Sequence, residues 1–296
     1  MERIEFDSDG YRLVGHLHLP DGGSARGAVV LTGPFSGVKE QVTGYYAERF
    51  AARGYAALAF DHRNWGESEG RPRQHEDATA KVADLRNAVS FLTGRPEVPA
   101  GRIAVCGVCL GGVYAVQHAA FDPRVRAVAL VAAAYNTPAV IRERFGVAAF
   151  DGLLAQFADI AQRQFKAGEP EYWPAVNPDG MPAGNPGPEP FAYYGTPRGA
   201  RPTWENRCTA LSVLQELTLD VGAALPLVSP TPLLIVHGRG DMAIPVTDAE
   251  AAFAVAGEPR DLLLLDTSNH IDLYDDDRYV LPAVDRAVVF FDTHLG

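Results

Sequence analysis

The chain has 296 residues, of which 47% are hydrophobic and 21% charged, so it is long enough to bury a sizeable core. Its net charge of −11 argues against a nucleic-acid partner or an anionic membrane surface, because binding phosphate groups requires a basic face. The sequence has no apolar run as long as a transmembrane helix, no apolar signal core near Met1, and only three cysteines, too few for a disulfide framework. We therefore expect a soluble, cytoplasmic, globular protein.

Short apolar runs alternate with amphipathic stretches over the first part of the chain. Residues 13–19 alternate apolar and other side chains, which predicts an antiparallel strand. Four continuous apolar runs follow and are typical of parallel strands buried on both faces. These runs are Ala28–Leu31, Tyr55–Phe60, Ile103–Val105 and Val125–Val131, with helices predicted at 42–52 and 77–92. The alternation predicts an α/β fold with a mostly parallel, doubly wound sheet.

The alternation stops after Val131 and resumes near residue 231. A segment this long between strands is rarely a plain loop, and we predict a largely helical cap inserted over the C-terminal edge of the sheet. The predicted domains are residues 1–137 and 231–296 for the core and 138–230 for the cap. The cap has helical stretches at 139–149, 153–165 and 208–219 around a Pro/Gly-rich part at 169–202, and the second core part has strands at 233–236 and 262–265 and a helix at 284–294.

One stretch joins a buried strand to a helix through Gly107-Val108-Cys109-Leu110-Gly111-Gly112. This pattern is that of a nucleophile elbow, with Cys109 where serine is commoner. Glycines flank the nucleophile because side chains there would collide with the neighbouring strand and helix. The helix dipole and free N–H groups would favour a thiolate. The alternative is that Cys109 is merely a small buried residue, as free cysteines often are.

Two later strands end in loops that carry an acid and a histidine. Asp241 follows the strand at 233–236, and His270 follows the strand at 262–265. Nucleophile, acid and histidine in this chain order are typical of α/β-hydrolases. We predict that His270 deprotonates Cys109 while Asp241 orients the imidazole ring, with Asp266 as the alternative acid. Cys106, Cys208 and His237 are expected to be packing residues.

An oxyanion hole needs two N–H groups, and Leu110 supplies one because it follows the nucleophile. The second is expected in the loop at 31–39. Pro34 has no N–H, so Phe35 is the predicted donor, with Ser36 next and an ordinary glycine turn as the alternative. The His, Cys and Asp residues lack metal-ligand spacing, and no phosphate-binding loop follows a strand. We expect neither a metal ion nor a cofactor.

The sequence resembles the dienelactone-hydrolase-like branch of the α/β-hydrolase superfamily. The resemblance is carried by the Cys109 elbow and by residues 32–41, 60–70, 122–128 and 269–275. It is similar to capped members that include uncharacterised bacterial hydrolases and fungal polyketide transferases. The resemblance implies nucleophile, acid and base roles for Cys109, Asp241 and His270. Small dienelactone hydrolases lack the cap, which puts dienelactone itself in doubt as the substrate.

The leading hypothesis is an enzyme that hydrolyses an ester, lactone or thioester through a Cys-His-Asp triad and a covalent acyl-enzyme. The first alternative is an acyltransferase or cyclase that hands a polyketide-like acyl group to an alcohol. The second is a lyase, an isomerase or a binding protein on a hydrolase scaffold. The expected partner is a small-molecule acyl substrate, which can be carried as a thioester; the oligomeric state is left open. Tyr135, Tyr193, Tyr194 and Trp204 are the aromatic residues proposed to line its pocket.

Overall fold

The sheet predicted from the apolar runs is present in the computed structural model, which describes residues 1–135 and 137–296. Within these residues, eight strands form one sheet in the order β1-β2-β4-β3-β5-β6-β11-β12. β1 and β2 are antiparallel to their neighbours, and the other strands run parallel to one another. The strands are β1 (Glu2–Ser8), β2 (Tyr11–His18), β3 (Ala28–Thr32), β4 (Ala56–Phe60), β5 (Ile103–Val108), β6 (Val125–Val131), β11 (Leu233–Gly238) and β12 (Arg260–Leu265).

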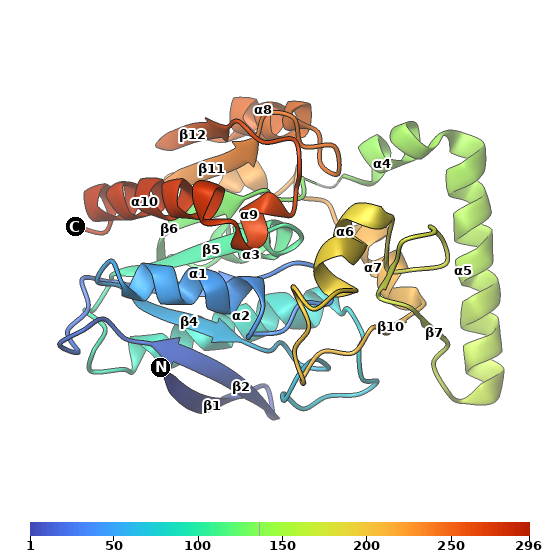
Figure 1. Ribbon diagram of the computed structural model, residues 1–296, viewed down its shortest axis with the longest axis horizontal. Coiled ribbons are helices and arrows are strands. Elements are labelled where there is room, and N and C mark those ends of the chain that lie inside the picture. The colour runs from blue at the N-terminus through green and yellow to red at the C-terminus, as the bar shows by residue number, and fades with distance from the viewer. Residues whose placement is uncertain (136) are drawn as a thin grey trace.

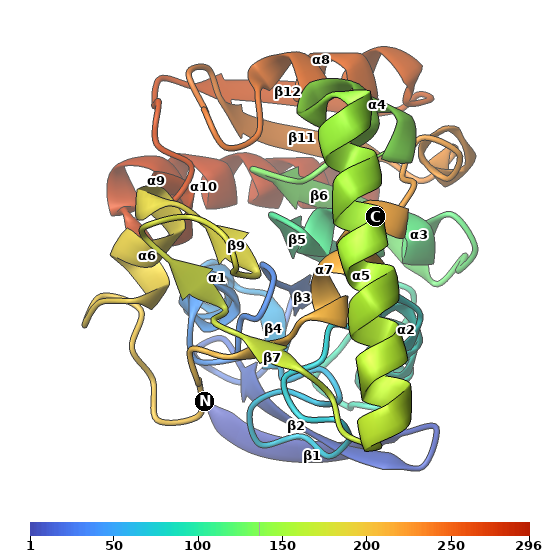
Figure 2. The same ribbon diagram turned by 90° about the vertical axis from the view of Figure 1, so that its right-hand side faces the viewer.

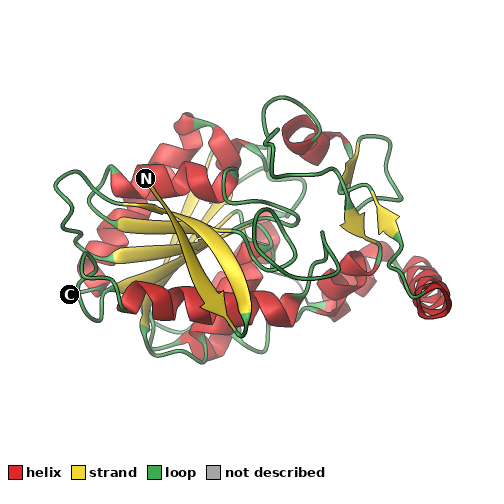
Figure 3. Ribbon diagram, turned by 90° about the horizontal axis from the view of Figure 1, so that it is seen from below, coloured by secondary structure: helices red, strands yellow, loops and turns green. Residues whose placement is uncertain are grey.

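Helices cover both faces of this sheet (Figures 1 and 3). α1 packs against α10 on one face, and α2 packs against α3 on the other (Figure 2). The helices of this part of the chain are α1 (Val42–Ala51), α2 (Ala78–Thr93), α3 (Gly111–Ala119), α8 (Val246–Val255), α9 (Asp272–Asp275) and α10 (Asp277–His294). The α/β-hydrolase fold with a mostly parallel sheet is therefore confirmed.

Burial explains which strands the sequence could reveal. Every residue of β3, β4, β5 and β11 is buried, as continuous apolar runs predict. β1 has charged, exposed residues at alternate positions because it lies at the edge of the sheet, and it was not predicted. α10 begins at Asp277, seven residues before the predicted helix, because the side chain of Asp276 caps its first turn. α8 was also not predicted.

The segment between β6 and β11 contains helices and short strand pairs. It comprises α4 (Pro138–Phe145), α5 (Val147–Ala167), β7 (Tyr172–Trp173), β8 (Val176–Asn177), β9 (Asn185–Pro186), α6 (Pro188–Tyr194), β10 (Cys208–Thr209), α7 (Leu211–Thr218) and the 3-10 helix η1 (Leu225–Val228). The break between α4 and α5 falls at Gly146, which has a φ of 80°. β7 pairs with β10 and β8 with β9, and neither pair was predicted.

This covering segment, residues 138–230, lies beside the end of the sheet at which β5 and β11 finish (Figure 1). Side chains of α6 and α7 share a cavity with the residues that follow β5 and β12. In the described part of the chain, no helix is long and apolar enough to cross a membrane.

The turn from β5 to α3 is crowded by neighbouring backbone and side chains. A Cβ atom at Gly111 would overlap the carbonyl group of Thr32, and one at Gly112 would overlap the side chain of Ala133. A glycine on the exposed face of α5, Gly152, has nothing within 4 Å of the same position. The glycines of the elbow are therefore required by close packing of α3 against β3 and β6.

We expect opposite effects from the same substitution at two of these glycines. Gly111→Ala forces the β5–α3 turn away from β3 and should lower the free energy of unfolding by about 2 kcal/mol or more. Gly152→Ala removes backbone freedom from an exposed helix and should raise it by about 0.5–1 kcal/mol. Urea denaturation of both variants measures the difference, and an equal effect at the two positions would contradict it.

Candidate active site

Cys109 lies in the tight turn between β5 and α3, with only 9% of its surface exposed. Its φ of 54° is in the left-handed region, which a side chain rarely adopts. Its N–H donates to the carbonyl of Val131 at 3.1 Å, and its own carbonyl accepts from Gly112 and Ala134, both at 2.9 Å. These bonds to β6 and α3 hold the strained residue in place.

The structure brings His270 and Asp241 together beside Cys109. His270 Nδ1 lies 2.7 Å from Asp241 Oδ2. His270 lines the same cavity as Cys109, and each of the two residues shifts the pKa of the other. Asp241 Oδ1 accepts the N–H groups of Ala243 and Ile244, each at 2.9 Å, which fixes the orientation of the carboxylate. The alternative acid, Asp266, is exposed to solvent. The arrangement therefore pairs His270 with Asp241.

Electrostatics at this site favour a thiolate on Cys109. Burial by itself raises the pKa of the Cys109 thiol, but the charge and hydrogen bond of His270 outweigh burial, so this pKa lies below its ordinary value. Burial likewise disfavours a charged His270, but Cys109 and Asp241 together raise its pKa to about 10. The two shifts together favour the ion pair of a thiolate and an imidazolium.

The other two cysteines have no such partner among the described residues. Burial raises the pKa of Cys106 to about 12 and that of Cys208 to about 12. Cys106 lies inside β5, and the Cys208 thiol points toward the carbonyl of Pro174. Both are packing residues, in agreement with the sequence.

Phe35 and Leu110 line the same cavity as Cys109. The N–H of Leu110 helps lower the pKa of the Cys109 thiol. Within residues 1–135 and 137–296, neither this N–H nor that of Phe35 donates to another backbone carbonyl or side chain. Ser36, the alternative donor, has a φ of 59° and is buried behind Phe35 in the same turn. These two N–H groups therefore stay the predicted donors to an oxyanion.

Tyr274 was missed by the sequence analysis. Its ring lines the cavity at Cys109 and packs edge-on against His270 with centroids 5.4 Å apart. Its hydroxyl helps lower the pKa of the Cys109 thiol. Tyr274 belongs to α9, a short helix that begins two residues after His270 and was not predicted.

The cavity at Cys109 has a volume of about 160 Å³. α6, α7 and β9 of the covering segment contribute polar side chains to its wall. The lining residues are Phe35, Cys109, Leu110, Ala134, Asn185, Glu189, Pro190, Glu216, Ala243, Ile244, His270, Ile271 and Tyr274. Glu189 also accepts the backbone N–H of His270, which ties α6 to the loop that carries the imidazole.

The aromatic residues proposed for the pocket lie behind its wall instead. The cavity lining, as the structure describes it, contains none of Tyr135, Tyr193, Tyr194 and Trp204. Tyr194 stacks on Trp204 with centroids 5.5 Å apart and contacts Tyr274 from behind. Tyr135 packs on the ring of His237. These large apolar surfaces are used in packing, because burying them is favourable wherever it occurs.

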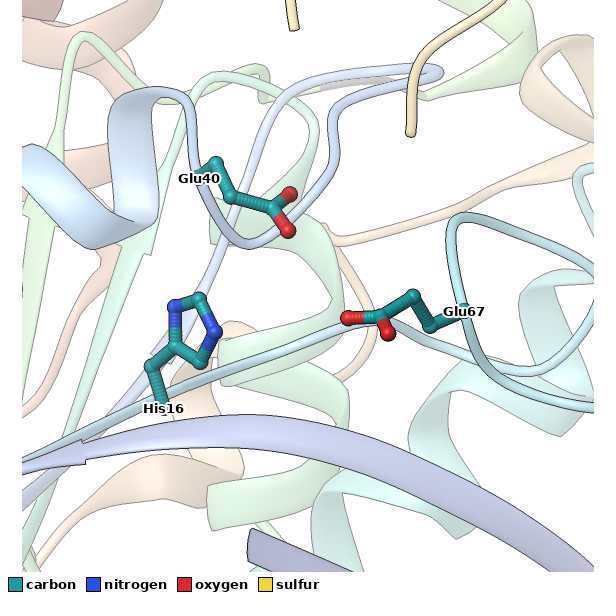
Figure 4. A group of neighbouring side chains, drawn as sticks. All are labelled: His16, Glu40 and Glu67. Carbon is teal, nitrogen blue, oxygen red and sulfur yellow. The ribbon is translucent and has the colours of Figure 1, made fainter. Parts of the chain in front are cut away.

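Figure 4 shows a second group of acidic and imidazole side chains, His16, Glu40 and Glu67, that face one another. Their ligand atoms lie within 4.8 Å of one another, which is close enough to suit a metal ion. The ammonium group of Lys39 already occupies this position: its Nζ lies 2.6 Å from both glutamates and 2.9 Å from Asp61. The group is therefore an ion-pair cluster under the loop of Phe35.

We expect the thiolate of Cys109 to show in its reaction with iodoacetamide. Because its pKa is lowered, the alkylation rate should fall only as the pH drops through a midpoint below about 8.5, the ordinary value. Asp241→Asn weakens the imidazolium and should raise this midpoint. Mass spectrometry of the alkylated protein checks the site. Alkylation of Cys106 or Cys208 at neutral pH, or an ordinary midpoint for Cys109, would contradict the assignment.

Three comparisons with known proteins bear on this site. Residues 23–175, more than half of the chain, match the model of the serine aminopeptidase S33 family. The uncharacterized protein PA2218 of Pseudomonas aeruginosa is 33% identical over 97% of this chain and 78% of its own. Its crystal structure matches with a TM-score of 0.87 and 31% identity, over 99% of this chain and 93% of that one.

Two fungal enzymes are also similar. The polyketide transferase grgF of Penicillium sp. is 29% identical over 99% of this chain and 96% of its own. The crystal structure of the α/β-hydrolase GrgF matches with a TM-score of 0.82 and 27% identity, over 99% of this chain and 98% of that one. The thiohydrolase aneE of Aspergillus aculeatus is 43% identical over 40% of this chain and 36% of its own. The predicted resemblance to capped hydrolases and polyketide transferases is confirmed. The chain belongs to the serine aminopeptidase S33 family of α/β-hydrolases and is an enzyme of the α/β-hydrolase type.

Proposed function

We propose that the protein hydrolyses an ester, lactone or thioester through a covalent acyl-enzyme on Cys109. The observation that supports this most strongly is the connected set of Cys109, His270 and Asp241 at one end of a buried cavity. A charged sulfur, a proton donor beside it and two free N–H groups are the components that acyl transfer needs.

In the first half of the reaction, the Cys109 thiolate attacks the substrate carbonyl. The resulting oxyanion accepts hydrogen bonds from the N–H groups of Phe35 and Leu110. As the tetrahedral intermediate collapses, the bond to the leaving group breaks and the His270 imidazolium protonates the departing oxygen or sulfur. The acyl group then remains on Cys109 as a thioester, and His270 is neutral.

In the second half, neutral His270 takes a proton from water, and the hydroxide attacks the thioester carbonyl. The carbon–sulfur bond breaks and releases the carboxylic acid with the Cys109 thiolate. The proton stays on His270, where Asp241 stabilises the imidazolium. The resting ion pair is restored, so each turnover consumes one water and no other reagent.

A second candidate is transfer of the acyl group to an alcohol. It is supported by the similarity to polyketide transferases along nearly the whole chain and by the low exposure of Cys109 under the covering segment. In this reaction an alcohol replaces water in the second half, with the same role for His270. The product is then an ester or a lactone.

We expect an acyl adduct on intact wild-type protein after brief exposure to activated esters and acyl thioesters. Cys109→Ala removes the nucleophile and should abolish the adduct and lower kcat by about 10⁴-fold or more. Cys208→Ser is the matched control, because it removes a buried cysteine of high pKa and should keep both adduct and turnover. Intact-mass spectrometry and product analysis provide the readouts.

The same experiment separates the candidates. Acid as the product in the presence of added alcohol supports hydrolysis, and ester or lactone supports transfer. Turnover by Cys109→Ala at the wild-type rate, or a wild-type protein that no acyl donor modifies, would contradict both and favour a non-acyl function on this fold.

A further inference from the structure

Glu216 brings a carboxyl group into the catalytic cavity from α7 of the covering segment. Its Oε1 is buried, and no donor among the described residues lies within hydrogen-bond distance of it. A buried carboxyl oxygen in this condition is costly to the folded state, because that atom has lost contact with water and gained no partner. The mechanism proposed above does not use it.

The neighbouring acid, Glu76, is paired through one of its two oxygens, while its Oε2 is buried without a partner among the described residues. Glu76 Oε1 lies 2.6 Å from Lys81 Nζ and accepts the hydroxyl of Tyr114 at 2.7 Å. Lys81 is thus held by Glu76. Burial first, then Glu76 and Cys109, raise the pKa of Glu216 well above its ordinary value, and Lys81 offsets this only in part. These effects favour the neutral carboxylic acid form of Glu216, which can both donate and accept a hydrogen bond.

The remaining wall of the cavity restricts what such a group can bind. The described lining contains no lysine or arginine, and its histidine, His270, is already paired with Asp241, so no free positive group of this lining complements a carboxylate or a phosphate group. Asn185 and Glu189 add further polar groups on the same segment. The volume of about 160 Å³ is close to that of a cavity that holds benzene, so the occupant is small.

The acyl group is the part of the substrate that must fit this cavity, because it stays attached to Cys109 after the leaving group departs. We propose that Glu216 binds a hydroxyl group on that acyl chain, and that the enzyme acts on esters or thioesters of short, uncharged hydroxyacyl groups. This inference rests on the proposed acyl-transfer function. Glu216 is a specificity-determining residue under this proposal, since it contacts the substrate away from the reacting carbonyl.

Two matched thioesters test the proposal, the butanoyl and 3-hydroxybutanoyl derivatives of one simple thiol. Wild-type protein should prefer the hydroxylated substrate by about tenfold or more in kcat/KM, as expected when one hydrogen bond fills an otherwise unsatisfied site. Glu216→Leu should reduce this ratio to near one, while Glu216→Gln, whose amide still donates and accepts, should keep part of it. Glu205→Leu removes an exposed carboxyl from the same segment and should leave the ratio as in wild type.

The Tm of thermal unfolding gives a second readout. If Glu216 had a structural role, Glu216→Leu would lower the Tm. Because Glu216 has no partner, Glu216→Leu should leave Tm unchanged or raise it. A lower Tm together with an unaltered substrate ratio would overturn the proposal, as would an equal rate with both thioesters in the wild type. If Glu216→Leu does not fold, Glu216→Ala and the wild-type ratio still decide. If neither thioester acylates Cys109, that result would instead contradict the proposed function itself.

Discussion

The proposed chemistry depends on a negative charge on the sulfur of Cys109, which is almost completely buried. A buried thiolate returns to its neutral form unless nearby groups compensate for the lost hydration. Here the compensation comes from the His270 imidazolium, the Tyr274 hydroxyl and the Leu110 N–H. These groups come from different parts of the chain, and they meet only because β5, β6, β11 and β12 are neighbours whose C-terminal ends lie along one edge of the sheet. The sheet order is thus the condition for the ion pair.

The backbone around Cys109 also holds the sulfur in position. The left-handed residue is held by bonds to Val131 and Ala134, which belong to or follow β6. Glycines on either side let α3 approach β3 and β6 closely enough for these bonds to form. The strained turn therefore depends on the close packing of α3. That packing in turn depends on the glycines of the elbow.

Local sequence patterns were sufficient for the parts of the structure that depend on local chemistry. Continuous apolar runs revealed the buried strands, and Cys109, Asp241 and His270 each follow one of them in the order expected. β1 was missed because an edge strand alternates charged and apolar residues over a short length. The sequence predicted an aromatic wall for the cavity, but the aromatic side chains named for it are packed outside the described lining. Glu189 and Glu216 could not be predicted, because only the folding of residues 138–230 over the sheet brings them to Cys109.

The hydrogen bond from the His270 N–H to Glu189 joins the covering segment to the loop of the general base. Glu189 also lines the cavity, so a substrate that touches this carboxylate touches a group bonded to the loop of the base. A contact made with the covering segment is thereby connected, through one hydrogen bond, to the backbone of the residue that moves the proton.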